Sequence, residues 1–200
     1  MSFDVARFSA EVSALGGLQK ASKFEARVYP RTGAQMRFFK FMCQAADLPG
    51  VTSALTDSRP LGYGSLVQTP LVTSYEALPL TLTLDNAGLT LSSMLEWYNR
   101  TVNKKYVPGG ALRTARDGSY PFQVGYKKDY AAEVEVDTFD DSGSVVCTHT
   151  FHEAWPVSLG TIRYSWAAVN QLAILPVSLV YTSWTSSLEG KTRDDTEETE

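Results

Sequence analysis

The stretch AAEVEVDTFDDSGSVVCTHTFH, residues 131–152, contains the clearest β-hairpin of this sequence. In its first part, apolar residues alternate with Glu133, Glu135 and Asp137, so the two kinds would lie on opposite faces of one strand. The turn sequence DDSG follows and leads into a second strand, Val145–His152. The fold is therefore expected to contain an antiparallel pair of strands here.

The same period-two pattern predicts further strands on both sides of this hairpin. They are expected at residues 22–30, 36–45, 78–85, 161–166 and 173–182. The segment 36–45 is apolar on both faces. Pro176 suggests an edge or an irregularity in the last strand, because proline cannot donate a ladder hydrogen bond.

Helical periodicity is convincing in only one segment, residues 91–102, for which Thr90 is the candidate N-cap. A weaker helical spacing over residues 3–16 suggests a helical N-terminal arm. Residues 47–77 and 103–121 show neither period and are rich in Gly and Pro. Long loops of this kind in a small β domain suggest contacts outside the subunit.

The chain has 200 residues and a mass of 22.0 kDa, the size of one domain with its own core. Its composition, 44% apolar and 20% charged, is typical of a soluble globular protein. No apolar run is long enough for a membrane helix, and residues 1–17 do not resemble a secretory signal. We therefore expect Cys43 and Cys147 to be reduced thiols in the cytosol, although one disulfide between them stays geometrically feasible.

The net charge of −4 comes from the C-terminal tail. Residues 189–200 contain six acidic and two basic side chains and no apolar one, so this tail is expected to be disordered. The remaining chain is neutral. The expected organisation is an N-terminal arm at 1–21, a β domain at 22–187 and a disordered acidic tail at 188–200.

The sequence offers little of the chemistry that an enzyme requires. His149 and His152 are three residues apart on an expected strand, so they would point to opposite faces and could not chelate one metal ion. No metal-binding, dinucleotide-binding or phosphate-loop motif is present. We therefore expect neither catalysis nor a cofactor.

Positive charge gathers before the hairpin, where residues 100–128 contain seven Lys or Arg side chains and one acidic side chain. No nucleic-acid-binding motif accompanies this cluster, and an acidic stretch follows at once. We expect the basic residues to meet an acidic patch on a neighbouring copy of the chain. The interface residues expected here are Lys104, Lys105, Arg113 and Arg116.

Several segments, in order, resemble one known family. The segment FMCQAADLPG, residues 41–50, is similar to the F-x-C-x-x-x-x-L-P-G segment of tail tube proteins from contractile-tailed bacteriophages. The segment LTLTLD (80–85), the helix with Trp97, and FHEAWPVSLG (151–160) follow in the order of that family. The resemblance covers residues 22–184.

The resemblance implies an all-β subunit with one flanking α-helix, in which an antiparallel β-sandwich or barrel contributes strands to a continuous barrel across a hexameric ring. Rings would stack into a tube through which DNA passes without specific binding. The implied partners are further copies and the tail sheath, baseplate and tail terminator proteins, without stable membrane association. The implied location is the virion tail, assembled in the bacterial cytoplasm.

The acidic strand face fits such a lumen. Lysine and arginine would retain a passing polyanion, because each phosphate contact is favourable and salt-sensitive. A wall of Glu133, Glu135 and Asp137 would instead leave DNA unbound. We therefore expect these three carboxylates to face the lumen.

Two further groups of residues have expected structural roles. Leu48, Pro49 and Gly50 would start an inter-subunit loop, and Trp155 with Pro156 would fix the corner after the hairpin. Packing within one subunit would explain either group equally well.

Three alternatives stay open at this point. The chain could be the baseplate ring that initiates the tube rather than the repeating tube protein. It could also be a monomeric β-sandwich that binds carbohydrate through Tyr63, Tyr75 and Tyr120. More distantly, Glu133 and Glu135 could serve a hydrolase, because alternate residues on a strand are about 7 Å apart.

Overall fold

The computed structural model describes residues 4–14, 16–30, 36, 39–59, 65–102 and 124–188. The strands are β1 (Phe24–Pro30), β2 (Cys43–Ala46), β3 (Val51–Ser58), β4 (Val67–Tyr75), β5 (Leu78–Thr83), β6 (Ala132–Phe139), β7 (Val145–Leu159), β8 (Ile174–Val180) and β9 (Ser183–Ser186). The helices are α1 (Val5–Ala14), α2 (Phe39–Met42), α3 (Leu89–Thr101) and α4 (Lys127–Tyr130). The expected antiparallel β fold with one flanking helix, α3, is confirmed.

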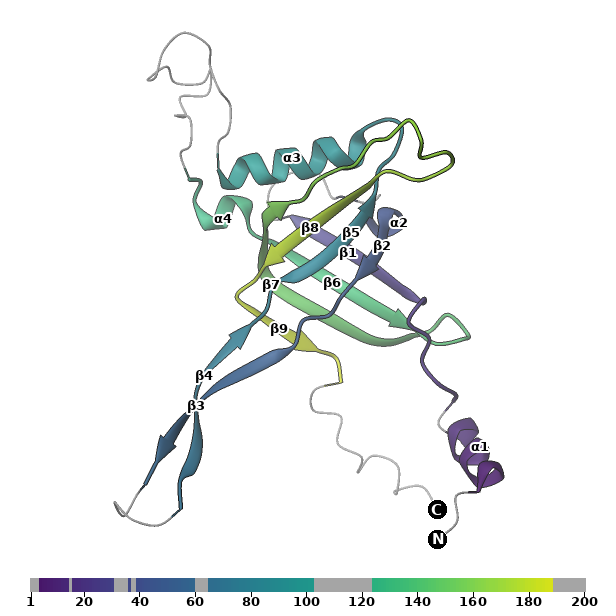
Figure 1. Cartoon of the computed structure of the whole chain (residues 1–200), viewed down its shortest axis with the longest axis vertical. Helices are drawn as coiled ribbons and strands as arrows, with labels where there is room; N and C mark the ends of the chain where they lie inside the picture. The colour runs from purple at the N-terminus through teal and green to yellow at the C-terminus, as the bar shows by residue number, and fades with distance from the viewer. Residues whose placement is uncertain are drawn as a thin grey trace.

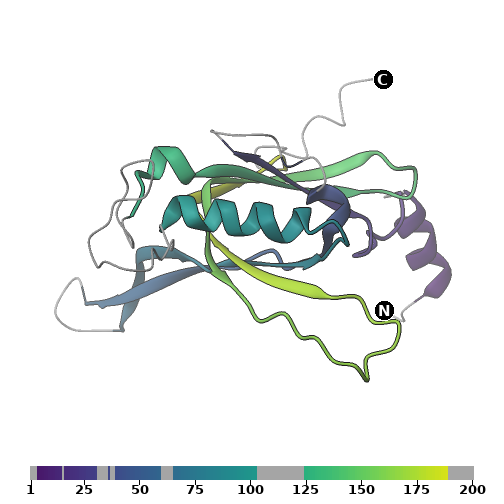
Figure 2. The same cartoon turned by 90° about the horizontal axis from the view of Figure 1, so that it is seen from above.

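Seven strands form one antiparallel sheet that folds back on itself (Figure 1). The strand order is β1-β6-β7-β8-β5-β2, and β9 pairs with the first half of β7. The second half of β7 pairs with β8. The sheet therefore has two layers, β1-β6-β7-β9 and β7-β8-β5-β2, and Figure 2 shows β6 and β8 on opposite sides of the molecule.

A bulge in β7 takes the strand from one layer into the other. Its register with β6 jumps from Phe151 to Ala154, and Glu153 between them has a positive φ of 54°. The Glu153 carboxylate accepts hydrogen bonds from Lys127 Nζ at 2.5 Å and Thr182 Oγ1 at 2.9 Å. A bulge bends a strand and increases its twist, so this position forms the corner of the fold.

The core lies between the two layers and beneath α3. The strands contribute alternate residues to it, namely Ala26, Val28, Leu78, Leu80, Leu82, Val134, Val136, Phe151, Leu175, Val177 and Leu179. From α3, Met94 and Trp97 are buried against this cluster. The Trp97 indole N–H donates to the carbonyl of Tyr130 at 2.7 Å, which satisfies its polar atom. Burial of this apolar surface is the main driving force for the fold.

The N-terminus of α3 is capped by Asp85. The expected cap at Thr90 is wrong, because the helix begins at Leu89 with Gly88 as the N-cap residue, at φ 71°. The Asp85 carboxylate accepts the N–H groups of Leu89 at 2.9 Å and of Thr90 at 2.7 Å. The side chain and N–H of Thr90, together with the N–H of Leu89, lower the pKa of Asp85 to about 2.

Replacing Asp85 by Ala is expected to lower the thermal midpoint by about 2–4 °C at neutral pH, because two N–H groups of the helix lose their acceptor. Since the pKa is lower in the folded chain, the stabilisation is complete above about pH 4 and is lost as the pH falls toward about 2. Thermal unfolding of both proteins across this pH range measures the effect. A difference that does not shrink at low pH would contradict it, and Asp85→Asn, which keeps an acceptor oxygen, should lose less.

Two of the expected strands are wrong in whole or in part. In 36–45, Phe39–Met42 form α2 and only the following residues form β2, because so short an apolar run suits a buried helical turn as well as a strand. Residues 161–166 form no strand, because β8 is already paired on both sides, with β5 and with β7.

The segment 47–77, expected to be a loop, contains the β3-β4 hairpin. Pro70 is tolerated there because it lies beside a bulge in the hairpin register. The hairpin extends away from the layered sheet (Figure 1), and none of its residues is buried.

Pro176 does not mark an edge strand, because β8 lies between β7 and β5. It lies where β7 ends, and its carbonyl accepts the N–H of Gly160 at 2.7 Å.

Candidate functional site

The outer face of the β1-β6-β7-β9 layer is polar. On β6, Glu133, Glu135 and Asp137 alternate with buried residues and share this face. Their side chains differ in exposure, at 49% for Glu133, 27% for Glu135 and 1% for Asp137. The expected acidic face therefore presents two carboxylates to solvent, and the third is covered.

Arg27 of β1 covers Asp137. Its guanidinium is ion-paired with one carboxylate oxygen, and Thr148 Oγ1 donates to the other, Oδ1, at 2.6 Å. Arg27 also lies 3.9 Å from Glu135 Oε2 and 3.4 Å from Glu25 Oε1. Three carboxylates from two strands thus surround one guanidinium, in a group that we call the Arg27 cluster.

The remaining polar face comes from β7 and β9. His152 lies 4.0 Å from Glu133 Oε1 through Nδ1 and 3.2 Å from Thr185 Oγ1 through Nε2. The ring of His149 instead packs against Trp184, with centroids 5.6 Å apart. The two histidines therefore lie on opposite faces, as expected.

Both ends of this layer carry open strand edges within the described residues. There, β1 pairs only with β6, and β9 pairs only with β7. An open edge presents a row of backbone N–H and C=O groups to which a strand of another chain can pair. The layer is thus polar on its outer face and available for pairing on both sides.

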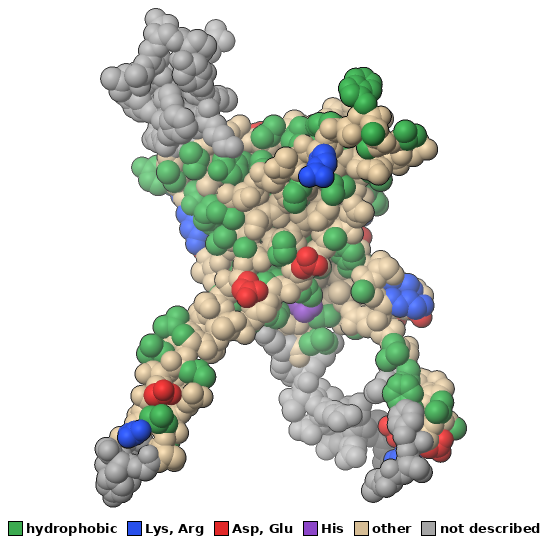
Figure 3. Space-filling model, in the orientation of Figure 1, with side chains coloured by type: hydrophobic (Ala, Val, Ile, Leu, Met, Phe, Trp, Pro, Cys, Tyr) green, Lys and Arg blue, Asp and Glu red, His purple; other side chains and the backbone are tan. Residues whose placement is uncertain are grey.

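Leu48, Pro49 and Gly50 link β2 to the projecting β3-β4 hairpin. Exposed apolar side chains follow the hairpin, namely Val51, Leu55, Val67, Leu71, Val72 and Tyr75. Figure 3 shows these hydrophobic atoms along an arm that leaves the body of the molecule. An apolar arm of this kind indicates a surface that another molecule covers. The expected role of Leu48–Gly50 at an inter-subunit contact stays a prediction, now placed at the root of this arm.

Trp155 and Pro156 follow directly after the β7 bulge. The Trp155 ring meets the Tyr130 ring edge to face, with centroids 5.8 Å apart. Pro156 is buried and lies opposite Leu179 of β8. Both residues thus stand where β7 enters the second layer, and their role in fixing this corner stays a prediction.

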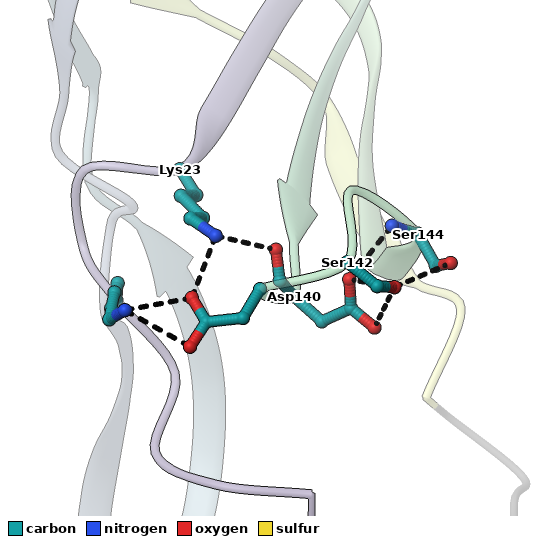
Figure 4. A network of polar contacts seen from close by, with 6 residues as sticks. Lys23, Asp140, Ser142 and Ser144 are labelled. Carbon is teal, nitrogen blue, oxygen red and sulfur yellow. Dashed lines mark hydrogen bonds and ion pairs between the residues drawn. The ribbon is translucent and has the colours of Figure 1, made fainter.

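A polar network joins the N-terminal arm to the β6-β7 turn (Figure 4). Lys23 and Lys20 pair with Asp141 at 2.7 and 2.9 Å, and together they lower the pKa of Asp141 to about 2. Lys23 Nζ also donates to the carbonyl of Asp140, whose carboxylate accepts the Ser142 hydroxyl at 2.7 Å. The root of the arm is therefore tied to the sheet, whereas no residue of α1 is buried.

The loop before β8 presents aromatic side chains. Trp166 is fully exposed there, and Tyr164 is 73% exposed. They line an open groove together with Arg163, Gln171 and Leu172. This loop is a second surface that indicates contact with another molecule.

Within the described ranges, no three His, Cys, Asp or Glu side chains gather as metal ligands. Both cysteines are free thiols, and burial raises the pKa of Cys43 to about 12, which suppresses its thiolate. Over the same ranges, no helix has the length and apolar character to cross a membrane.

Several expected residues cannot be placed. Lys104, Lys105, Arg113, Arg116, Tyr63, Tyr120 and the tail from residue 189 lie outside the described residues. Tyr75, the remaining tyrosine of the carbohydrate-binding alternative, packs against Tyr181 with centroids 5.9 Å apart.

Two parts of the candidate site do not follow from the sequence pattern. Arg27 is visible there only as a polar residue of a strand, because its partner strand cannot be aligned with it without the register. The hairpin escapes the period-two pattern because neither of its faces is buried within the subunit and Pro70 interrupts β4. The apolar residues around Thr69 and Thr73 are the signal that could have indicated it.

The phage tail tube protein family model matches residues 8–187. No curated protein matches the chain in sequence. A chain of the anti-feeding prophage (AFP) baseplate, 6-fold symmetrised, is 15% identical, with a TM-score of 0.59 over 84% of this chain and 95% of that one. A chain of the sheath-tube complex of an extracellular contractile injection system, PVC, in the extended state, is 14% identical, with a TM-score of 0.55 over 92% and 98%.

A chain from the structure of the PVC sheath/tube terminator in the extended state is also similar, at 13% identity and a TM-score of 0.56 over 84% of this chain and 94% of that one. At identities this low, the structural similarity shows the fold alone. The family model, in contrast, matches most of the chain from the N-terminal arm to the end of β9. The chain therefore belongs to the phage tail tube protein family.

Proposed function

We propose that this chain is the repeating subunit of the inner tube of a contractile phage tail. Six copies close into a ring, and rings stack into a conduit for DNA. The observation that carries the proposal is the β1-β6-β7-β9 layer, with a polar outer face and open edges at both ends. Tail tube proteins are structural components, so the proposal requires neither catalysis nor a cofactor.

Ring closure follows from the two open edges. If β1 of one copy pairs with β9 of the next, six copies of four strands make a closed barrel of about 24 strands, which leaves no edge exposed. The number six is supported by the fold's similarity to a chain of a baseplate described as 6-fold symmetrised.

The polar face of the layer then lines the lumen, because the opposite face is occupied by the core. Glu133 and Glu135 give this wall exposed negative charge, which does not hold a polyanion. Asp137 contributes to the wall through its pair with Arg27 rather than as an exposed carboxylate.

Stacking requires the top surface of one ring to fit the bottom surface of the next ring. These are two different surfaces of the same subunit, because a head-to-tail contact repeats along an axis. The β3-β4 hairpin, which starts after Leu48, Pro49 and Gly50, supplies such a projecting apolar surface. In this proposal, Lys104, Lys105, Arg113 and Arg116 contact acidic side chains of a neighbouring copy. The partners are a sheath, a baseplate and a terminator in the virion tail, in line with the PVC sheath-tube and terminator chains of similar fold.

One observation favours a second candidate, the baseplate ring that initiates the tube. A chain of the AFP baseplate has the same fold over nearly its whole length. An initiator has two different end surfaces, whereas a repeating subunit has ends that fit each other. The two candidates therefore differ in whether the protein alone grows beyond one ring.

Negative-stain electron microscopy of the purified chain, with mass by light scattering across concentration and salt, tests the proposal. The expected result is tubes of stacked six-membered rings. Single rings that never stack would favour the initiator. A monomer under all conditions, including high protein concentration, would overturn the repeating subunit.

A further inference from the structure

Positive charge is almost absent from the four strands of the polar layer. Every residue of β1, β6, β7 and β9 is described, and among them Arg27 is the only Lys or Arg. Its side chain is 36% exposed, so it reaches the polar face. A lone arginine on the wall of a DNA conduit is a ready phosphate ligand, because guanidinium groups bind phosphate through paired N–H donors.

The Arg27 cluster occupies this guanidinium from several sides. Asp137 contacts it directly, and Glu135 and Glu25 lie within 3.9 and 3.4 Å of it. Thr148 fixes the Asp137 carboxylate by donating to its second oxygen at 2.6 Å. The guanidinium is thus held by acceptors from the same sheet.

A second cation beside the Arg27 cluster, among the described residues, is held in the same way. Lys40 of α2 lies 3.8 Å from Glu25 Oε1, so Glu25 stands between the two basic side chains. Even with Lys40 counted beside the cluster, three carboxylates face two cations, so the net charge is negative. A phosphate approaching Arg27 would therefore have to displace a carboxylate that is already in place.

We infer that Asp137, with Glu135 and Glu25, is a specificity-determining group that keeps Arg27 from binding DNA phosphate. This inference rests on the proposed function, since it assigns the polar face to the lumen. The inference gives the buried carboxylate of Asp137 a function that differs from the repulsion of DNA by the exposed carboxylates. Asp137 acts by positioning and neutralising Arg27 and does not itself face the DNA.

The experiment measures binding of a short labelled DNA duplex to the full-length chain by fluorescence anisotropy across NaCl concentration. The variants are Asp137→Asn and Glu135→Gln, which remove carboxylates from the cluster. Each is expected to raise affinity about tenfold at low salt, because a charged hydrogen bond to phosphate becomes possible. The slope of log affinity against log salt should steepen by about 0.9 for each additional phosphate that Arg27 neutralises.

The matched control is Glu133→Gln, which makes the same change of charge on the same face of β6. Glu133 is paired with His152 rather than with Arg27, so this variant shows the effect of losing one wall charge alone, and its binding should stay close to the wild-type level and well below that of Glu135→Gln. The double variant Arg27→Gln, Asp137→Asn should bind DNA at about the wild-type level, because it removes the phosphate-binding guanidinium together with the carboxylate that blocks it.

The pattern of results decides the inference. Equal binding by Glu135→Gln and Glu133→Gln, or an increase in affinity that persists without Arg27, would overturn it. If Asp137→Asn fails to fold, as judged by circular dichroism, Glu135→Gln still tests it, because Glu135 is partly exposed.

The mass of each sample, recorded beside its binding curve, separates the inference from the proposed function. Variants that form rings but show no Arg27-dependent increase in affinity would be consistent with the proposed tube and would reject the inference about Arg27. An Arg27-dependent increase in DNA affinity in a chain that never forms rings would support the role of Asp137 in blocking Arg27 and would reject the proposed tube function.

Discussion

Replacing Leu71 of β4 by Asp is expected to stop rings from stacking while the subunit stays folded. Leu71 is 68% exposed on the projecting hairpin and has no partner across the bulge in its register. The substitution therefore disturbs no strand pair and no core contact. In a stacked tube, the same side chain would enter an apolar contact at every subunit.

The expected effect on assembly is large. Burial of one leucine contributes about 1.5–3 kcal/mol, and an aspartate in its place must also lose water. The protein concentration at which tubes appear should rise at least tenfold for each subunit contact. Sedimentation and negative-stain microscopy across concentration measure this shift, and circular dichroism checks the fold.

Two variants serve as controls for Leu71→Asp. Leu71→Met keeps an apolar side chain of similar size and should assemble like the wild type. Leu89→Asp makes the same replacement at an exposed leucine in the first turn of α3, where a negative charge suits the helix. Tubes that form equally well with Leu71→Asp would show that the hairpin does not carry the stacking contact.

Phe151→Ala is expected to lower the free energy of unfolding by about 3–5 kcal/mol. Phe151 is 1% exposed and lies in β7 just before the bulge. Its ring centroid is 4.9 Å from that of Tyr181 and 6.1 Å from that of Trp184. Removing the ring leaves a cavity at the point where the two layers meet.

Urea unfolding followed by tryptophan fluorescence measures this loss. Val157→Ala on the same strand is the matched control, because Val157 is 42% exposed and outside the core, so its truncation should change stability by about 0.5 kcal/mol or less. A loss of under about 1 kcal/mol for Phe151→Ala would contradict the position of the core.

The strands that could be predicted from the sequence are those with one buried face. In β6 and β5, apolar residues alternate with polar ones because only one side contacts the core. The hairpin lacks this signal, since neither of its faces is buried within the subunit. The α2 segment is ambiguous for another reason. It is only four residues long, so its apolar residues fit the period of a helix and the period of a strand equally well.

The acidic face could be predicted because three carboxylates at alternate positions must share one side of a strand. The fate of each carboxylate could not, because it depends on the pairing of β1 with β6. That register places Arg27 opposite Glu135 and beside Asp137, on a strand more than one hundred residues away in the sequence. A charge pattern within one strand therefore gives the sign of a surface, but neighbouring strands decide which charges are exposed.

The shape of the β3-β4 hairpin has a consequence for when a tube can begin to grow. An isolated two-stranded hairpin is only marginally stable in water, and no residue of this one is buried, although Tyr75 at the end of β4 packs against Tyr181. Its full ordering is therefore coupled to a receiving surface, so a free subunit is a poor seed. In the proposed tube, addition to an existing end is favoured over spontaneous nucleation. At low subunit concentration such a barrier would favour growth from a template that presents the first receiving ring, whereas a high concentration of purified chain would overcome it.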